Sequence, residues 1–418
     1  QADSDYILFY TGTSPIELHP YAIGRMYQIA ESNDGALFYS DYQEIRQGKK
    51  IHHPTLEYQT GSIRNDFDFG QLLLFRNDSF QQVVAQMNTD YRFAALYELR
   101  LSISRLGKIV HIPETLYTVQ PTDLRLSGEK QFDYVDPANR EVQLEMEAVC
   151  TAHLQAIGAW LAPEFQRIDF GQENFAREAS VIIPVRNRKR TIAEAVESAL
   201  QQQTDFSFNV IVVDNHSTDG TGQILTELSR RYPNLIHHIP ASTELGIGGC
   251  WTEAILLPEC GKFAIQLDSD DLYKDCHVLQ RIVDTFYQEN CAMVIGSYQM
   301  VDFKLEEIPP GLIAHREWTP DNGRNNALRI NGLGAPRAFY TPVLRQIKFP
   351  NVSYGEDYAT ALAISRKYPI ARIYDPLYLC RRWEENSDHD LDIQQLNNYN
   401  FYKDKIRTLE IQARISGK

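Results

Sequence analysis

Two short apolar runs, each followed by a polar loop and a helical pattern, constrain the fold of this chain most strongly. Residues 179–185 and 209–213 are rich in β-branched residues. After the first run, Thr191 and Glu194 stand three apart as in a capping box, and apolar residues recur at helical spacing over 192–200. The order strand, helix, strand, helix predicts parallel strands joined by crossover helices, and therefore an α/β sheet.

A third apolar run, residues 263–267, ends in the sequence Asp-Ser-Asp-Asp at 268–271. In open α/β sheets, ligands bind at the carboxyl ends of the strands, so these acids should lie together with Arg186, Asn187 and Asp214. Carboxylate clusters suit hard divalent cations and the phosphates that such cations carry. The alternative is that the acids are solvated turn residues. No glycine-rich dinucleotide fingerprint and no P-loop sequence occurs, which argues against either kind of nucleotide site.

Four motifs together resemble the family 2 glycosyltransferases. In chain order they read SVIIPVRNR at 180–188, VIVVDNHSTDGT at 210–221, FAIQLDSDDLY at 263–273 and GEDYA at 355–359. Each motif is modest by itself, but their order and spacing across about residues 180–385 make the set specific. The resemblance implies an α/β domain of the GT-A type, the Rossmann-like mixed sheet of nucleotide-diphospho-sugar transferases.

The resemblance also implies a donor site. In the family, the aspartate after the second strand accepts a hydrogen bond from the nucleotide base, and the loop after the first strand flanks base and ribose. The D-x-D motif binds ribose and the Mg²⁺ or Mn²⁺ that bridges the diphosphate, so Asp268 and Asp270 are the implied metal ligands. Relatives often carry a tyrosine where Arg186 stands here. The implied donor-binding residues are Pro184, Val185, Arg186, Asn187, Asp214, Asp268 and Asp270.

The Glu356-Asp357 pair carries the implied catalytic step. In the family, the aspartate is the general base that deprotonates the acceptor hydroxyl for in-line attack, which inverts the anomeric centre. We expect burial beside Tyr354 and Tyr358 to raise the pKa of Asp357 toward working pH. The alternative is a helix start at which acids are favoured by the helix dipole.

Further candidates lie in two less specific places. Residues 314–318 stand where relatives carry a loop that closes on donor and acceptor, which makes His315, Arg316 and Trp318 candidates. The alternative for Trp318 is an ordinary packing role. His389 is a candidate metal or phosphate ligand, with a solvated polar tail as the alternative.

The amino-terminal part, residues 1–120, resembles the second half of the same domain with its carboxylates missing. When segment 6–13 is aligned with segment 263–270, Thr11 and Thr13 stand where the D-x-D aspartates stand. The two similar segments lie too far apart in the sequence for a short repeat, which indicates a domain duplication. We therefore expect residues 1–120 to form a degenerate, partial GT-A-like module.

Such a half-module would leave one edge of its sheet open, to be covered by another part of the protein or by missing sequence. We expect upstream sequence to have been removed, because the chain starts at Gln1 rather than at a methionine. Next, we expect residues 121–178 to be a linker, with a polar stretch at Pro121–Gly128 and an amphipathic helix over Pro137–Leu161 that braces the two modules. The glycosyltransferase domain is expected to span residues 179–418.

The composition of the chain argues against some classes of binding partner and favours one cellular location. The formal net charge of −14 argues against nucleic acid, for which a basic face is the usual footprint. Six cysteines without paired metal-ligand spacing favour a reduced intracellular chain. No apolar stretch is long enough to span a membrane. We therefore expect a cytoplasmic protein, with at most peripheral contact at the inner membrane face.

The sequence leaves three functions open. The first is a metal-dependent inverting glycosyltransferase that uses a nucleotide-diphospho-sugar donor and a glycan, lipid-linked or protein acceptor, in the synthesis of a cell-surface glycan or polysaccharide. The second is a non-catalytic protein that binds a nucleotide-sugar or carbohydrate. The third is a sugar nucleotidyltransferase, against which the lack of glycine in residues 185–190 argues.

Overall fold

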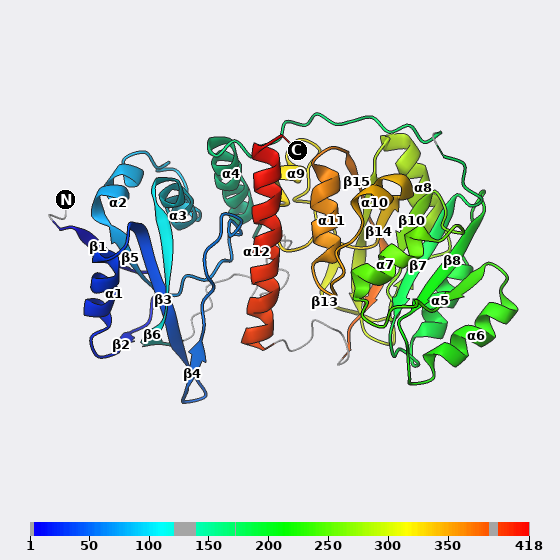
Figure 1. Ribbon diagram of the computed structural model, residues 1–418, viewed down its shortest axis with the longest axis horizontal. Helices are drawn as coiled ribbons and strands as arrows, with labels where there is room; N and C mark the ends of the chain where they lie inside the picture. Colours follow the sequence, from blue (N-terminus) through cyan, green and yellow to red (C-terminus); the bar gives the residue numbers. More distant parts are fainter. Residues whose placement is uncertain (1–3, 121–138, 172, 384–391, 418) are drawn as a thin grey trace. The chain divides into compact units, whose positions relative to one another are not determined.

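The computed structural model describes residues 4–120, 139–171, 173–383 and 392–417 (Figure 1). These residues belong to two compact units. Unit 1 comprises Gln1–Trp160, Leu328–Asn331 and Asp390–Lys418, and unit 2 comprises Leu161–Ala327 and Gly332–His389.

Unit 2 is built around a mixed nine-stranded sheet. One half is parallel, because β7 pairs in parallel with β10 and β8, and β8 pairs in parallel with β9. In the other half, β14 is antiparallel to β10 and β12, and β15 is parallel to β12. The strands are β7 (Ala179–Val185), β8 (Phe208–Asp214), β9 (Leu235–His238), β10 (Phe263–Gln266), β11 (Leu272–Tyr273), β12 (Met293–Val301), β13 (Glu307–Ile313), β14 (Arg337–Tyr340) and β15 (Ile370–Arg381).

Helices connect the strands of unit 2, as the sequence predicted for its first part. Val181, Ile182 and Ile183 of β7 have no exposed surface, although successive side chains point to opposite faces of a strand. The sheet is covered on both faces, which explains why the apolar run of β7 is continuous rather than alternating. The helices are α5 (Ile192–Leu200), α6 (Thr221–Arg231), α7 (Ile247–Leu256), α8 (Val278–Glu289), α9 (Gly323–Asn326), α10 (Thr341–Ile347) and α11 (Glu356–Ser365).

The predicted capping box at the start of α5 is wrong. Thr191 precedes the helix, but its side chain makes no cap hydrogen bond and instead donates to the carbonyl of Ser269 at 2.9 Å. Glu194 forms an ion pair with Arg381. Both side chains are used for contacts with distant segments, which local sequence does not reveal.

Unit 1 contains a six-stranded sheet with the order β1-β5-β3-β6-β2, and β4 pairs with β3. A cluster of buried apolar side chains lies on each side of this sheet, one around Phe38 and Leu74, the other around Leu37 and Leu73. The elements are β1 (Tyr6–Tyr10), β2 (Ile16–Leu18), α1 (Ala22–Glu31), β3 (Gly35–Arg46), β4 (Lys49–His53), β5 (Leu72–Arg76), α2 (Asn77–Val84), α3 (Ala95–Leu106), β6 (Lys108–Val119), α4 (Arg140–Ala156) and α12 (Ile393–Ile415).

The sheet of unit 1 has the strand order and directions of one part of the sheet of unit 2. Strands β1, β5, β3, β6 and β2 take the places of β10, β14, β12, β15 and β11. In both units the first two pairings are antiparallel, the third is parallel and the last is antiparallel. The hairpin strand β4 pairs with β3 as β13 pairs with β12.

The pairing registers of the two sheets agree as well. Ile7 lies opposite Phe75 in unit 1, and Ala264 lies opposite Phe339 in unit 2. Counting four residues along each strand puts Thr11 at the place of Asp268. This count takes Ile7 as the counterpart of Ala264, as the sequence alignment does, and the domain duplication stays a prediction.

The compact units correct the expected domain boundaries. Helix α12 belongs to unit 1, although the sequence assigned residues 179–418 to the glycosyltransferase domain. Its Asp404, which is 1% exposed, accepts a hydrogen bond from Ser62 at 3.0 Å and pairs with Arg407 at 2.8 Å. The guanidinium of Arg407 also donates to the carbonyl of Ile330. Buried polar contacts of this kind were not visible in the sequence.

The amphipathic helix predicted before the glycosyltransferase motifs is present as α4, which is part of unit 1. Val149 and Leu154 of α4 are buried, whereas Leu144 is 49% exposed. The predicted polar linker at 121–128 lies outside the described residues. None of the six cysteines, all of which lie in the described residues, forms a disulfide bond. Across the described segments, no helix is both long and apolar enough to cross a membrane.

Candidate active site

The loops after β7 and β8 are tied together at one edge of the sheet of unit 2. Asn187 adopts a left-handed conformation with φ of 55°. Its backbone N–H donates to the hydroxyl of Ser217 at 2.9 Å, and its side-chain oxygen accepts from the N–H of Thr218 at 2.8 Å. The loop that follows Pro184 and Val185 of β7 is thereby fixed against the loop after β8, while the side chain of Arg186 is exposed.

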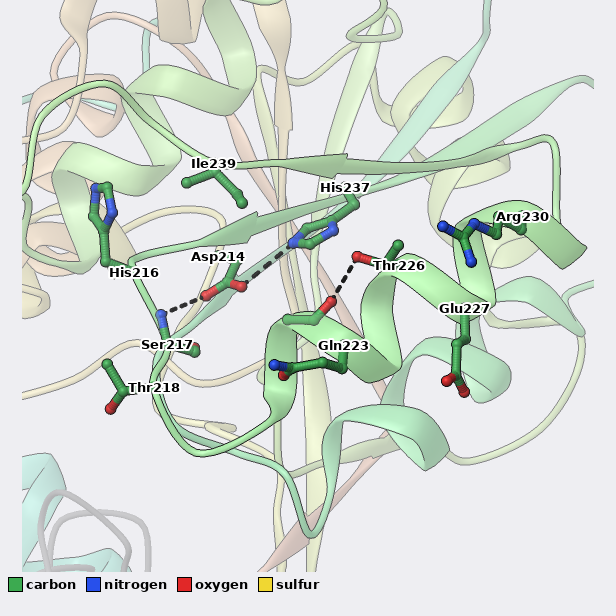
Figure 2. Close-up of a pocket in the computed structure, with 11 residues that line it drawn as sticks. Asp214, His216, Ser217, Thr218, Gln223, Thr226, Glu227, Arg230, His237 and Ile239 are labelled. Carbon is green, nitrogen blue, oxygen red and sulfur yellow. Dashed lines mark hydrogen bonds and ion pairs between the residues drawn. The ribbon is translucent and has the colours of Figure 1, made fainter.

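Asp214, the last residue of β8, is 2% exposed. One carboxylate oxygen accepts a hydrogen bond from the N–H of Ser217 at 2.9 Å, and the other lies 3.3 Å from Nε2 of His237 on β9 (Figure 2). Burial by itself would raise the pKa of Asp214, but the contacts with His237 and Ser217 outweigh it and lower that pKa. The carboxylate is therefore ionised at neutral pH and is a hydrogen-bond acceptor.

An open pocket of about 600 Å³ lies beside Asp214. Gln223 and Thr226 of α6 line one side, and His237 and Ile239 line the other (Figure 2). The carboxyl end of β8 therefore presents a polar concave surface to a ligand.

The acidic loop after β10 is held by β15. The N–H of Asp268 donates to the hydroxyl of Tyr378 at 2.9 Å, and the N–H of Arg381 donates to the carboxylate of Asp271 at 2.8 Å. The indole N–H of Trp383, just beyond β15, donates to Oδ2 of Asp270 at 3.2 Å. The loop is therefore fixed at several points by one strand.

The acidic loop has the donor set and the charge that a divalent cation needs. Burial raises the pKa of Asp268 and of Asp271, and the neighbouring carboxylates raise both further. A bound cation would relieve this repulsion. In the described part of the chain, no group of three or more His, Cys, Asp or Glu side chains is arranged to hold an ion. Asp268 and Asp270 nevertheless fit Mg²⁺ or Mn²⁺, because such ions use one or two carboxylates plus phosphate and water oxygens.

The Glu356-Asp357 pair begins helix α11. Gly355 precedes it with φ of 79°, a conformation that glycine adopts without strain. Oδ2 of Asp357 lies 2.6 Å from Nη2 of Arg337, the first residue of β14. Nη1 of Arg337 donates to Oε1 of Gln266 at 3.1 Å, and Nε2 of Gln266 donates to both carboxylate oxygens of Asp268 at 2.9 and 3.1 Å. One chain of polar contacts thus joins the D-x-D loop to α11.

Burial was expected to raise the pKa of Asp357, but the carboxyl group whose pKa is raised is that of its neighbour Glu356. This side chain is 9% exposed, and its Oε2 has no hydrogen-bond partner among the described residues. Burial, and then the charge of Asp357, raise the pKa of Glu356 to about 8. The carboxylate of Asp357 is 22% exposed and is held by Arg337.

The remaining candidates are placed differently. His315 is 2% exposed and lies 2.8 Å from Glu317, and burial lowers the pKa of the imidazole despite this acid. Trp318 is 6% exposed, with the guanidinium of Arg372 5.2 Å from its ring. Arg316 is exposed. His315 and Trp318 therefore pack inside unit 2 here, and their roles stay predictions. His389 lies outside the described residues.

The sequence did not point to five side chains that hold this site. Each of them contacts a predicted site residue directly. For some, the only indication in the sequence was a polar residue inside an apolar run. Gln266, for example, ends a buried strand, where a polar side chain needs a partner. The five are His237, Gln266, Arg337, Tyr378 and Trp383.

Comparison with known proteins shows which family this part of the chain is similar to. The model of the family described as Glycosyl transferase family 2 matches residues 180–347. An uncharacterized glycosyltransferase of Nostoc sp. is 32% identical over 123 residues, which cover 29% of this chain and 37% of that protein. The poly(ribitol-phosphate) beta-glucosyltransferase of Bacillus spizizenii is 24% identical over 230 residues, which cover 53% of this chain and 35% of that protein.

This chain thus spans about a third of the length of those two relatives. Among solved structures, S. aureus TarS 1–349 in complex with UDP-GlcNAc is 21% identical with a TM-score of 0.43, over 57% of this chain and 72% of that one. The family model therefore identifies residues 180–347 as a glycosyltransferase domain of family 2, and the mixed sheet of unit 2 is the α/β sheet expected of the GT-A fold.

Proposed function

We propose that unit 2 is a metal-dependent inverting glycosyltransferase that moves a sugar from a nucleotide-diphospho-sugar to an acceptor hydroxyl. The observation that carries this proposal is the chain of contacts from Asp268 through Gln266 and Arg337 to Asp357, which brings the D-x-D loop beside the expected base. Asp214 ends a parallel strand at the same edge of the sheet.

The donor nucleotide would lie across the ends of β7, β8 and β10. Asp214 is ionised and suited to accept a hydrogen bond from a ring N–H of the base. Pro184, Val185 and Asn187 would flank base and ribose, and the exposed Arg186 would contact ribose or phosphate.

The diphosphate would lie at the acidic loop, where Asp268 and Asp270 would hold Mg²⁺ or Mn²⁺. When bound, such an ion neutralises the charge that develops on the departing nucleoside diphosphate. Trp383 and Arg188 fix the carboxylate of Asp270, with Nε of Arg188 3.6 Å away. The basic side chain also offsets part of the acidity of the loop.

Asp357 would act as the general base. It takes the proton of the acceptor hydroxyl while the hydroxyl oxygen forms a bond to the anomeric carbon, and the bond from that carbon to the diphosphate oxygen breaks. Attack opposite to the leaving group inverts the anomeric centre. Glu356, whose pKa is raised to about 8, keeps its proton at neutral pH and adds no second negative charge beside this base.

A cell-surface polymer is the acceptor class we favour, because one relative is named for transfer to poly(ribitol-phosphate). The acceptor would be a glycan, a lipid-linked chain or a protein. A cytoplasmic location with peripheral contact at the inner membrane face remains the prediction from the sequence.

The test uses the full chain, a panel of UDP- and GDP-sugars, and Mn²⁺. Asp270→Asn should abolish both the release of nucleoside diphosphate and metal-dependent nucleotide binding. Asp357→Asn should keep binding but stop turnover, and Asp275→Asn, at an exposed acid nearby, is the control. Turnover retained in both test variants would overturn the proposal. Release of pyrophosphate from a nucleoside triphosphate would indicate a nucleotidyltransferase, and binding without turnover in the wild type would indicate a binding protein.

For unit 1, we infer a degenerate, partial copy of the GT-A domain. The common strand order, directions and registers of the two sheets support this inference. At the places of Asp268 and Asp270 stand Thr11 and Thr13, so unit 1 would have no metal-binding pair of its own.

A further inference from the structure

We propose that Arg337 and Gln266 are positioning residues that fix the general base Asp357 relative to the donor carboxylate Asp268. The inference rests on the function proposed for unit 2. It adds to that function a defined link between the donor half and the acceptor half of the site.

The geometry of the link is specific at every contact. Oε1 of Gln266 accepts from both the backbone N–H and Nη1 of Arg337, each at 3.1 Å. Nε2 of Gln266 donates to both oxygens of Asp268. This amide can face only one way, because a carboxylate cannot donate and a guanidinium cannot accept. Nη2 of Arg337 then holds Oδ2 of Asp357 at 2.6 Å.

Rigid elements carry both linking residues. Gln266 is the last residue of β10 and is 5% exposed, and Arg337 is the first residue of the antiparallel neighbour β14. Their backbones are therefore held by the sheet, and the two side chains bridge the carboxylates of Asp268 and Asp357 from fixed positions.

The charges around Asp357 explain why a cation is needed there. Arg337 and Glu356 lie beside this carboxylate, and Asp268, Glu356 and Tyr378 act on Arg337 together with Asp357. Burial opposes the charge on Arg337, but Asp357 and Asp268 raise the pKa of the guanidinium above its usual value. Arg337 therefore stays charged and stabilises the ionised form of Asp357, the form that can accept a proton.

Unit 1 provides an internal comparison. By register, Phe9 takes the place of Gln266, and Leu73 takes the place of Arg337. The same sheet is thus built with apolar residues at both positions, where Thr11 replaces Asp268. The polar link is not required by the fold, since it is missing where the carboxylate is missing, and this points to a role in the reaction.

The test removes the guanidinium and measures steady-state kinetics with the nucleotide-sugar that the panel identifies. Arg337→Gln should lower kcat about 100-fold, the scale of a small misplacement of a catalytic group, with little change in the affinity for UDP or GDP in Mn²⁺. The acid limb of the kcat profile should move to higher pH, because a carboxylate without its cation has a higher pKa. Arg337→Lys should restore part of kcat.

The second arm tests the link through the amide. Gln266→Met should weaken metal-dependent nucleotide binding and lower kcat, and in the double variant with Arg337→Gln the two losses of kcat should not be additive. Arg281→Gln, at a partly exposed ion pair on α8, is the control for removal of a cation.

Three results would decide the matter. If Asp357→Asn is inactive but folded Arg337→Gln keeps wild-type kcat and pH profile, the link is wrong and the proposed function stands. If Asp357→Asn keeps turnover, Asp357 is not the base and the link is wrong; if Asp270→Asn keeps turnover as well, the proposed function itself is wrong. If Arg337→Gln does not fold, the Arg337→Lys and Gln266→Met variants carry the test, and normal kcat in both overturns the link.

Discussion

At the scale of single residues, two adjacent carboxyl groups have opposite environments. Glu356 is buried without a partner for Oε2 among the described residues, whereas Asp357 is held by a guanidinium. Local sequence placed both acids at the start of a helix, and the helix is there. Which acid is buried depends on how α11 packs against α7 and α10, and the local sequence Gly355-Glu356-Asp357 does not predict that packing.

The raised pKa of Glu356 predicts a pH-dependent stability. Below about pH 4.5 the group is protonated in both states, and between that pH and about 8 only the unfolded state loses its proton. The free energy of unfolding should therefore fall as pH rises across this window and level off above it. Glu356→Gln should be more stabilising, relative to wild type, at pH 8.5 than at pH 5, as measured by urea unfolding.

Exposed Glu227 on α6 provides the control for this measurement. The Glu227→Gln variant, measured at the same two pH values, gives the effect of removing a carboxyl group from an exposed position. A Glu356→Gln variant that behaves in the same way would contradict the assignment of the raised pKa.

At the scale of elements, β15 fixes the acidic loop. Tyr378 is 1% exposed, and its hydroxyl accepts the N–H of Asp268. Arg381 and Trp383 follow on the same strand and its extension, and they hold Asp271 and Asp270. The D-x-D motif was recognisable from three residues, but the strand that positions it lies about a hundred residues later.

Tyr378→Phe removes the acceptor of the Asp268 N–H and leaves that buried donor unsatisfied. We expect a loss of about 1–3 kcal/mol in the free energy of unfolding, the usual effect of an unpaired buried polar group. Nucleotide affinity in Mn²⁺ should fall as well. Tyr232→Phe, at the end of α6, is the matched control; equal affinity in the two variants would show that β15 does not position the loop.

At the scale of the whole molecule, chain order and compact units do not coincide. The last helix belongs to unit 1, together with Leu328–Asn331 from the middle of the chain. Asp404 and Arg407 of α12 form a buried ion pair there, next to Arg64 at 3.3 Å from Asp404. Unit 1 is therefore assembled from three separate stretches of sequence.

Asp404→Ala would remove the carboxylate that pairs with the buried Arg407, while Arg64 would keep its ion pair with Asp66. Removing one partner of a buried ion pair typically costs about 3–5 kcal/mol, and we expect a loss of that size in urea unfolding. Lys405→Ala, at an exposed position on the same helix, should change stability little. A loss below about 1 kcal/mol for Asp404→Ala would show that α12 does not stabilise unit 1 in this way.

The sequence by itself determined the local features: the buried strands of unit 2, the loops at their ends, and the aspartates at 214, 268 and 270. These follow from periodicity and from the polar residues that end each run, which depend only on neighbours in the chain. The place of α12 and the contacts of Gln266 and Arg337 were decided by the tertiary structure alone. The contact between Gln266 and Arg337 joins residues 71 positions apart, and the one between Ser62 and Asp404 of α12 joins residues 342 positions apart. No local pattern records which distant group a buried polar side chain will meet.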